Sequence, residues 1–460
     1  MQVSAEESRY RLLALLAAGD SSLAQRMTDL EESCGSHLAI DNSMRILLLS
    51  TPHTYRAEAF RKAARKLGIE VFTAIDLPDE LGKPREAALT LDFRDPDRAV
   101  QHIVAYAHDH PLAAILSVDD SASLIAAQAS AALRLPHNSP QAAAAARDKF
   151  VMRSLLKQGG VRVPNFRLFS TADDLAQVAG QVDYPCVVKP LALNGSRGVI
   201  RADDTGQFVA AAQRLSRLLQ SLEPSPDPRP FLVEEFIPGF EVALEGLLDH
   251  GELKVLALFD KPDPLDGPFF EETIYVTPSR LSAEIQAAIA QCTADSAQAL
   301  GLAEGPVHAE LRINEYGAWL IEMAGRSIGG LCSQTLRFAH SADVSLEEII
   351  LRQALGLEID ALERENRSGG VMMIPIPEAG LLRGVSGIEE AKAVTGIEDV
   401  QITAKLNYPL VPLPEGESYL GFIFARGDTP AEVEAALRAA HACLHFDVQP
   451  VIQLTMINTQ

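Results

Sequence analysis

Residues 308–330 read HAELRINEYGAWLIEMAGRSIGG, in which two glutamates, Glu310 and Glu322, interrupt two otherwise apolar stretches. The predicted strands AELRI and AWLIEM flank the turn sequence NEYG. If the three residues ending at Gly317 form the loop, this glycine takes a left-handed conformation in which a side chain would clash. Counting back along both strands from that loop places Glu310 opposite Glu322. The stretch therefore predicts two neighbouring carboxylates on one face of a β-hairpin.

The paired carboxylates indicate a compensating cation, because like charges directly opposite each other destabilise a β-ladder. A register shift of one residue would put the two side chains on opposite faces and remove the repulsion. Oxygen ligands suit Mg²⁺, which takes one or two carboxylates together with phosphate oxygens and waters. From the hairpin alone, two interpretations stay open: a magnesium site, or a solvent-facing hairpin with incidental acids.

The composition is that of an ordinary globular chain with an excess of acidic residues. Its 460 residues, 47% of them apolar, are enough for roughly three domains of about 150 residues each. The net charge of −22 argues against nucleic acid or an anionic membrane as a partner, since no basic surplus exists to neutralise phosphates. No run of about 18 apolar residues predicts a transmembrane helix. A nucleotide remains compatible, because it needs only a few local cations.

The cysteines and the N-terminal residues bear on localisation. Five cysteines are scattered without a CxxC spacing, which favours a reducing cytoplasm. Acidic residues precede the apolar run at 12–19 and no cleavage signal follows it, so a helical leader is expected over residues 1–43 in preference to a signal peptide.

Strands alternating with helices predict a parallel, doubly wound α/β segment after Met44. Buried-strand patterns occur at 45–50, 69–76 and 113–120, with helical patterns between and after them. Asp120 then lies at the carboxyl end of a strand, where open α/β sheets bind ligands.

The rest of the chain predicts mixed α and β structure. Ser139 and Pro140 open a helix that is expected to run to Gln158. Residues 231–248 read as strand, short connection, strand. From Arg367 the pattern changes to strands and a final helix, which predicts a small α+β domain.

Upstream of the hairpin, two lysines and a glycine-rich loop have the chemistry of a phosphate site. Lys189 stands inside the apolar strand CVVKP and should require an anion. The NGSRG sequence after it, with Ser196 and Arg197, can present backbone N–H groups and cations to phosphate, although GxxxxGK[ST] is absent. The alternatives are an ordinary hairpin turn with Lys189 reaching out to solvent, and a solvated helix lysine at Lys149.

Further candidates surround these groups. Glu234, Glu235, Phe236 and Ile237 follow an apolar strand and can offer backbone groups and an apolar wall to a base, and Glu241 can hold a ribose. Arg326 follows the second acidic strand, where it can stabilise negative charge developing on a phosphate, or serve as a surface salt-bridge partner.

The order and spacing of these motifs resemble the ATP-grasp superfamily. They are Lys149, VVKP with its glycine-rich loop, VEEFI-PG-FE, and E…E-x-x-x-R. Within it the chain resembles the bacterial L-amino-acid ligases of the bacilysin-synthetase type over roughly residues 44–447. The supporting segments are VDD (118–120), NSPQAAAAARDK (138–149), GPFFEETIYVTPS (267–279), IEMAGRSIGG (321–330) and GESYLGFIFARGDTPAEVEAAL (416–437).

The resemblance implies a fold of mixed α/β and α+β classes in three domains. These are a Rossmann-like pre-ATP-grasp domain (44–140), a two-lobed ATP-grasp domain (141–366, with its lid at about 165–232) and a small α+β C-terminal domain of L-amino-acid-ligase type (367–460). It also implies a homodimer.

The resemblance assigns roles to the candidate residues. Lys149 and Lys189 would contact ATP phosphates, with Ser196 and Arg197 in the loop that closes over them. Residues 234–237 would line the adenine pocket, Glu241 would bind ribose, and Glu310 and Glu322 would hold two Mg²⁺ ions, which Mn²⁺ could replace. Arg326 would stabilise an acyl phosphate and the tetrahedral adduct. Asp120, Glu272, Gly329 and Gly330 are candidates on the substrate side.

Two positions depart from the pattern of the family. Many ATP-grasp enzymes carry Asn two residues after the second metal carboxylate, where this chain has Ala324. Tyr275 stands where some dipeptide ligases have His, which puts their substrate preference in doubt here.

The implied activity is ATP-dependent joining of a small-molecule carboxylate and an amine, such as two L-amino acids, through an acyl phosphate with release of ADP and phosphate. The alternatives are a ligase of another ATP-grasp class, with a natural-product, nucleotide-precursor or carboxyphosphate-type substrate, and a non-catalytic nucleotide-binding regulator. The intact lysines, paired glutamates and arginine argue against the regulator.

Overall fold

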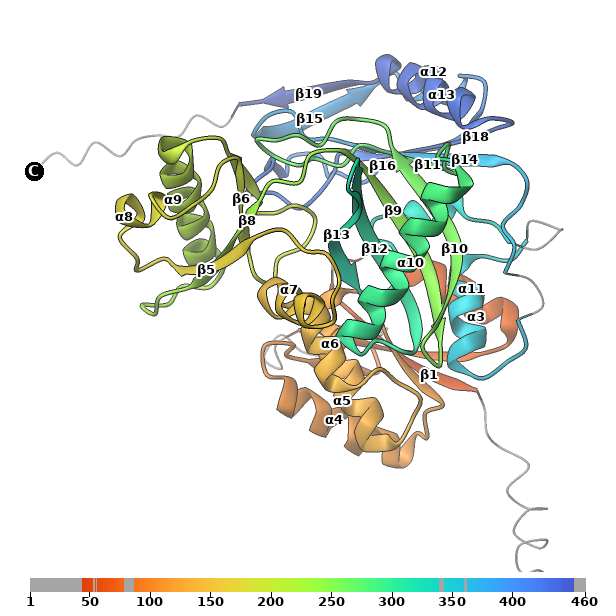
Figure 1. Cartoon of the computed structure of the whole chain (residues 1–460). Helices are drawn as coiled ribbons and strands as arrows, with labels where there is room; N and C mark the ends of the chain where they lie inside the picture. The colour runs from red at the N-terminus through yellow and green to blue at the C-terminus, as the bar shows by residue number, and fades with distance from the viewer. Residues whose placement is uncertain are drawn as a thin grey trace, which may run out of the picture.

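The computed structural model describes residues 44–450 apart from residues 53, 55, 78–86, 339–342 and 360–361. Among these residues, no helix has both the length and the apolar character needed to cross a membrane. The expected helical leader at 1–43 lies outside the described residues. The described chain is organised around sheets that Figure 1 shows as an N-terminal unit, a lid, a central sheet and a C-terminal layer.

The N-terminal sheet is parallel with strand order β3-β2-β1-β4, so the prediction of a doubly wound α/β segment is confirmed. Its elements are β1 (Arg45–Ser50), α3 (Ala57–Leu67), β2 (Glu70–Asp76), β3 (Leu89–Leu91), α4 (Pro96–Asp109), β4 (Ala114–Ser117), the 3-10 helix η2 (Asp120–Ala122) and α5 (Ser123–Leu133). Alternate residues of β1 face opposite layers: Ile46 and Leu48 pack with α3, whereas Leu47 and Leu49 pack with α4 and α5. Asp120 is the first residue of η2 and lies just beyond β4, at the carboxyl end of the sheet.

The predicted single helix from Pro140 to Gln158 is wrong, because the chain forms two helices, α6 (Pro140–Arg147) and α7 (Lys149–Gln158). Asp148 between them has an extended backbone, and its side chain accepts the N–H groups of Phe150 and Val151 as the N-cap of α7. The break makes Lys149 the first residue of a new helix, and this position directs its side chain into the interior.

The lid is an antiparallel sheet with strand order β5-β8-β6-β7, set to one side of the central sheet (Figure 1). Its elements are β5 (Phe166–Ser170), α8 (Leu175–Ala179), β6 (Cys186–Pro190), β7 (Ile200–Ala202), α9 (Thr205–Leu222) and β8 (Pro230–Glu235). Phe208 and Leu215 of α9 pack against the buried face of the sheet. The glycine-rich loop, residues 191–199, connects β6 to the edge strand β7 of the lid sheet.

The central sheet has eight strands in the order β13-β12-β9-β10-β11-β14-β18-β16. Its first part and the helices near it are β9 (Phe240–Asp249), β10 (Glu252–Lys261), β11 (Ile274–Thr277), α10 (Ala283–Leu300), β12 (Gly305–Asn314), β13 (Gly317–Ala324), the 3-10 helix η3 (Cys332–Thr335) and α11 (Leu346–Ala354). Its buried residues join two cores: Leu244, Val307 and Leu320 pack toward α7 and α10, whereas Ala243 and Phe259 pack toward α3 and α11.

The C-terminal segment extends the central sheet and adds a three-stranded layer with order β17-β15-β19. Its elements are β14 (Ser368–Ile374), β15 (Gly380–Ser386), α12 (Ile388–Lys392), β16 (Ile397–Ile402), β17 (Pro409–Leu410), β18 (Gly421–Gly427), α13 (Pro430–Cys443) and β19 (His445–Gln449). Thr429 closes the start of α13 in a capping box with Glu432. The sheet continues without a break across residue 367, where the sequence places a domain boundary.

The β12–β13 hairpin brings Glu310 and Glu322 into register, as predicted, but by a different route. Asn314 pairs with Gly317, so the loop has two residues, and the predicted three-residue loop is wrong. The Asn314 side chain accepts the N–H of Tyr316 at 3.0 Å, which closes this tighter turn, and Gly317 has the expected positive φ of 109°. A β-bulge at Ile321 restores the register, and the freed Ile321 carbonyl accepts from Arg153 at 2.7 Å.

Candidate active site

A cavity of about 710 Å³ lies where the N-terminal sheet, the lid, the central sheet and a C-terminal loop meet. Its volume is in the range of small-molecule sites. It gathers, from positions far apart in the sequence, all but one of the predicted site residues: Asp120, Lys149, Lys189, Ser196, Glu234, Glu235, Phe236, Ile237, Glu241, Glu272, Glu310, Glu322, Arg326, Gly329 and Gly330. The alternatives that placed Lys149 and Lys189 in solvent are wrong, since both side chains are buried.

Lys149 connects the glycine-rich loop to the acidic hairpin. Its Nζ donates to the carbonyl of Leu193 at 2.8 Å and forms an ion pair with Glu322 at 3.0 Å. Beyond Leu193, the backbone is left-handed at Gly195 and at Ser196, whose φ is 56°. This curvature turns the loop back over the cavity, beside the ammonium group.

Glu234 is the centre of a buried ion-pair triad at the base of the lid. Lys189 Nζ donates to Glu234 Oε2 at 2.6 Å, and Arg153 Nε donates to Oε1 at 2.6 Å. Burial alone would raise the pKa of Glu234, but Arg153 and Lys189 lower it to about 2. Burial lowers the pKa of Lys189, although Glu234 opposes that shift. Glu234 therefore holds Lys189 and Arg153 in place, while the buried Phe236 and Ile237 after it form the apolar wall.

Four charged groups form a compact cluster beneath the hairpin. Carboxylate oxygens of Glu241, Glu272 and Glu310 lie within 4.8 Å of one another, and Lys261 Nζ lies 2.8, 2.5 and 3.5 Å from them. Burial and the charge of Glu310 raise the pKa of Glu272 to about 7, although Lys261 opposes the shift. For Glu310, burial opposes ionisation, but Lys261 and His308 hold its pKa well below the usual range. The cluster thus keeps Glu310 as an anion facing the cavity.

The donor set of the hairpin fits Mg²⁺. Glu310 and Glu322 are Cα partners on adjacent strands, both line the cavity, and both offer the carboxylate oxygens that this ion prefers. Ala324 lies buried at the expected third position and provides no ligand atom. The two glutamates would therefore hold the ion beside Lys149 and Lys261, with triphosphate oxygens supplying further ligands.

Arg326 and Asp120 form a partly buried ion pair between the central sheet and the N-terminal sheet. Arg326 Nε donates to Asp120 Oδ2 at 2.7 Å, and Arg326 NH2 lies 2.6 Å from the same oxygen. On the same side, Arg56 donates to the Oγ of Ser327 at 2.6 Å. The neighbouring arginines make this end of the cavity suited to an anion, and Asp120 fixes the direction of the Arg326 guanidinium.

Asp120→Asn should lower kcat about tenfold and change the KM for ATP less than twofold, because it weakens the hold on Arg326 without touching the lysines. Steady-state kinetics measure both constants. The exposed Asp109→Asn in the same domain is the control and should behave as the parent protein. An unchanged kcat in Asp120→Asn would show that the pair does not position Arg326.

Arg197 is the predicted site residue that the structure places outside the cavity lining. Its guanidinium turns to the C-terminal segment, where Nε donates to the carbonyl of Glu415 at 2.8 Å and NH1 donates to Glu417 at 2.8 Å. The assignment of Arg197 to the loop that closes over the ATP phosphates stays a prediction, and these bonds show that the same loop contacts the C-terminal segment.

Four residues of the site were not predicted from the sequence: His308, Arg312, Lys261 and Arg56. His308 and Arg312 stand two residues before and after Glu310, so strand alternation alone puts them on the same face. His308 Nδ1 lies 3.2 Å from Glu245, and Arg312 donates to Glu241 at 3.0 Å. The roles of Lys261 and Arg56 could not be predicted from local sequence patterns, because their acidic or carbonyl partners are brought close only by the fold.

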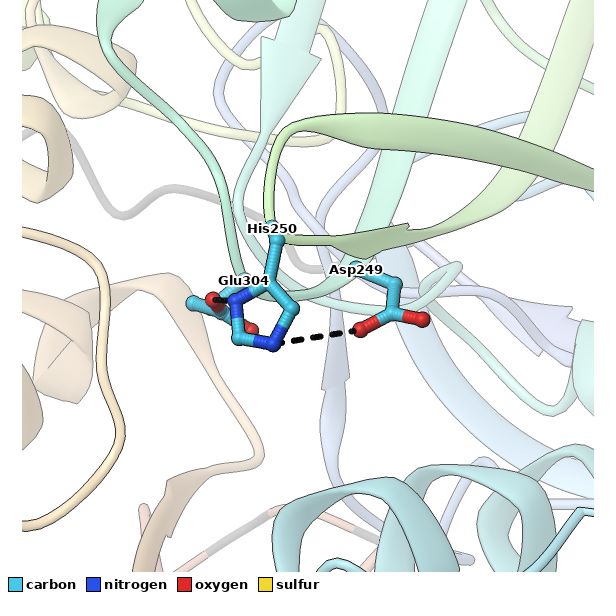
Figure 2. Close-up of side chains that lie close together, drawn as sticks. All are labelled: Asp249, His250 and Glu304. Carbon is cyan, nitrogen blue, oxygen red and sulfur yellow. Dashed lines mark ion pairs between the residues drawn. The ribbon is translucent and has the colours of Figure 1, made fainter.

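A second cluster of possible metal ligands, Asp249, His250 and Glu304, lies outside the cavity (Figure 2). His250 Nδ1 lies 2.9 Å from Glu304, whereas Nε2 lies 3.9 Å from Asp249. The two carboxylates thus approach different ring nitrogens, and Lys254 Nζ lies 2.7 Å from Asp249. One ligand atom from each of the three residues lies within 4.8 Å of the others, but in this structure the imidazole and the ammonium group of Lys254 are the partners of the two carboxylates.

Three family models match successive parts of the chain. They are the ATP-grasp N-terminal domain over residues 60–137, the ATP-grasp domain over residues 182–335, and the L-amino acid ligase C-terminal domain 2 over residues 372–449. The middle match contains β6, β7, α9 and β8 of the lid, the acid cluster and the β12–β13 hairpin.

Individual proteins are similar to large parts of the chain. The uncharacterized protein y4rH of Sinorhizobium fredii is 24% identical over 417 residues, which cover 90% of this chain and 85% of that protein. The alanine–anticapsin ligase of Bacillus amyloliquefaciens is 27% identical over 249 residues, about half of each chain (51% and 52%). The crystal structure of an L-amino acid ligase from Bacillus licheniformis superposes with a TM-score of 0.72 and 25% identity, covering 89% of this chain and 100% of that one.

Proposed function

Because this chain belongs to the ATP-grasp ligases, we propose that it joins the carboxylate of one small molecule to the amine of another with conversion of ATP to ADP and phosphate. The observation that carries the proposal is that one cavity is lined by Lys149, Lys189, the glycine-rich loop and the paired Glu310 and Glu322. The matched C-terminal domain and the similarity to ligases of amino acids support L-amino acids as the substrate class.

In this proposal the substrate carboxylate attacks the γ-phosphorus of ATP and displaces ADP, which gives an acyl phosphate. The amine then attacks the acyl carbon, loses a proton and displaces phosphate. Lys149 and Lys189 balance charge on the phosphates, and Arg326 stabilises the acyl phosphate and the tetrahedral adduct. Glu272, which lines the cavity, is the acid proposed to receive an α-amino group of the substrate. The closed glycine-rich loop excludes water, which would otherwise hydrolyse the acyl phosphate.

Two Mg²⁺ ions held by Glu310 and Glu322, with Mn²⁺ as a substitute, complete the proposed site. When bound, they would neutralise charge on the β- and γ-phosphates. A cytoplasmic homodimer with the three predicted domains, 44–140, 141–366 and 367–460, is also part of the proposal. Light scattering after size exclusion measures its mass.

A matrix of amino-acid pairs incubated with ATP and Mg²⁺ tests the proposed function. We expect ADP, phosphate and a product whose mass equals the sum of the two amino acids less one water, in equal amounts. Phosphate release and mass spectrometry read the outcome. AMP and pyrophosphate would exclude the acyl-phosphate route. ADP formation only with non-amino-acid carboxylates or amines would move the chain to another ligase class, and no ADP with any pair would favour a nucleotide-binding regulator.

A further inference from the structure

The glycine-rich loop is bonded to a C-terminal loop more than 200 residues away in the sequence. Gly198 donates its backbone N–H to the carbonyl of Pro414 at 2.8 Å, and Arg197 donates to the carbonyl of Glu415 and the carboxylate of Glu417. We name this C-terminal loop, residues 411–419, the latch loop. It thus contacts the lid at the segment that covers the cavity.

A two-point ion pair fixes the same loop to the helix of the lid. Arg214 of α9 donates from Nε and NH2 to the two carboxylate oxygens of Glu415 at 2.6 and 2.8 Å. This paired geometry fixes the relative orientation of the two side chains. Arg214 also lies 5.0 Å from the centroid of the Phe269 ring, so its guanidinium is held from a second side.

The shape of the latch loop is itself fixed. The N–H of Gly416 donates to the carbonyl of Pro412 at 2.9 Å, and a Cβ on Gly416 would lie only 1.8 Å from the carbonyl oxygen of Val411. Glu417 and Tyr419, just beyond this turn, line the cavity. The latch loop is therefore a preformed turn that reaches from the central sheet to the wall of the site.

We propose that the latch loop is a working part of the nucleotide site, in which Arg214 and Glu415 are positioning residues that hold the glycine-rich loop closed over a nucleoside di- or triphosphate. A nucleotide enters and leaves past the glycine-rich loop, so the stability of the closed state sets nucleotide affinity and water access. The inference rests on the proposed function for its nucleotide, but its contacts are independent of which carboxylate and amine are joined.

The test uses the full chain with Arg214→Glu, Glu415→Arg and the double charge swap. Isothermal titration measures the Kd of ADP with Mg²⁺, and hydrogen exchange measures protection of residues 191–199. Each single variant should raise the Kd about fivefold, the scale of a partly exposed two-point ion pair, and should speed exchange in the glycine-rich loop. The double swap restores the pair in reverse and should return both readouts to within about twofold of the parent.

Arg167→Glu is the matched control, because Arg167 is an exposed arginine on β5, at the edge of the lid sheet away from β7. It makes the same change of charge and should leave the Kd and the exchange rates unaltered. Gly416→Ala provides a second route, since it disturbs the turn without altering charge and should reproduce the single-variant phenotype.

A double swap no better than the two single variants, or unchanged exchange in residues 191–199, would overturn the latch. Neither readout requires amide formation. A protein that binds ADP but joins no carboxylate–amine pair would therefore refute the proposed function while the latch result stood.

Discussion

Glu322→Gln should lower kcat by about 10²- to 10³-fold and raise the Mg²⁺ concentration needed for half-maximal rate. The substitution keeps the size of the side chain but removes one of the two hairpin carboxylates that face each other in the cavity. Loss of one preorganised electrostatic group costs about this much in other enzymes. Steady-state turnover against Mg²⁺ concentration is the measurement.

If Glu322 only formed the ion pair with Lys149, its substitution would not change the Mg²⁺ concentration needed for half-maximal rate. A changed Mg²⁺ dependence therefore indicates that Glu322 binds the metal. Glu315→Gln in the exposed hairpin loop is the matched control and should retain parental kinetics. Turnover of Glu322→Gln at the parental rate, or with parental Mg²⁺ dependence, would contradict the assignment of the hairpin.

Glu234→Gln should reduce the free energy of unfolding by about 3–5 kcal/mol, the usual cost of leaving buried charges without their partner. Glu234 is 3% exposed and compensates both Lys189 and Arg153. Urea titration followed by circular dichroism measures the change. Glu235→Gln is the control, because the adjacent carboxylate is exposed and its loss should cost less than about 0.5 kcal/mol.

The same carboxyl group should make stability depend on pH. Its pKa falls to about 2 in the folded protein, below the ordinary value of 4.5. The stabilisation is therefore complete above about pH 4.5 and is lost as the pH falls toward 2. The Glu234→Gln protein should lack this part of the acid dependence. Equal stability of variant and parent at neutral pH would show that the triad is not a net stabilising element.

The sequence predicted the parallel N-terminal sheet and the facing of Glu310 and Glu322, because buried-strand patterns and strand alternation are local signals. The turn length and the bulge that bring the two glutamates into register were not predicted. A two-residue turn closed by Asn314 shifted the register, and the bulge at Ile321 shifted it back. At the bulge, the Ile321 carbonyl accepts a hydrogen bond from Arg153 of α7, a partner that the hairpin sequence does not reveal.

Long-range electrostatics account for most of what the sequence did not predict in the site. Lys261 reads as an unremarkable residue at the end of a strand, and only folding surrounds it with Glu241, Glu272 and Glu310. Arg197 also bonds to Glu415 and Glu417, which lie 218 and 220 residues away in the chain. Pairings of this kind leave no periodicity and no spacing in the sequence.

The continuity of the central sheet limits how the C-terminal segment can be treated in protein engineering. Beyond β11 the sheet consists of β14, β18 and β16, all from residues 368–427. Cutting the chain at residue 367 would remove β14, one of the two strands to which β11 is paired, and would expose a new apolar edge. The segment is therefore not an interchangeable cassette, and a chimaera between relatives would have to exchange β11 and its partner strands together.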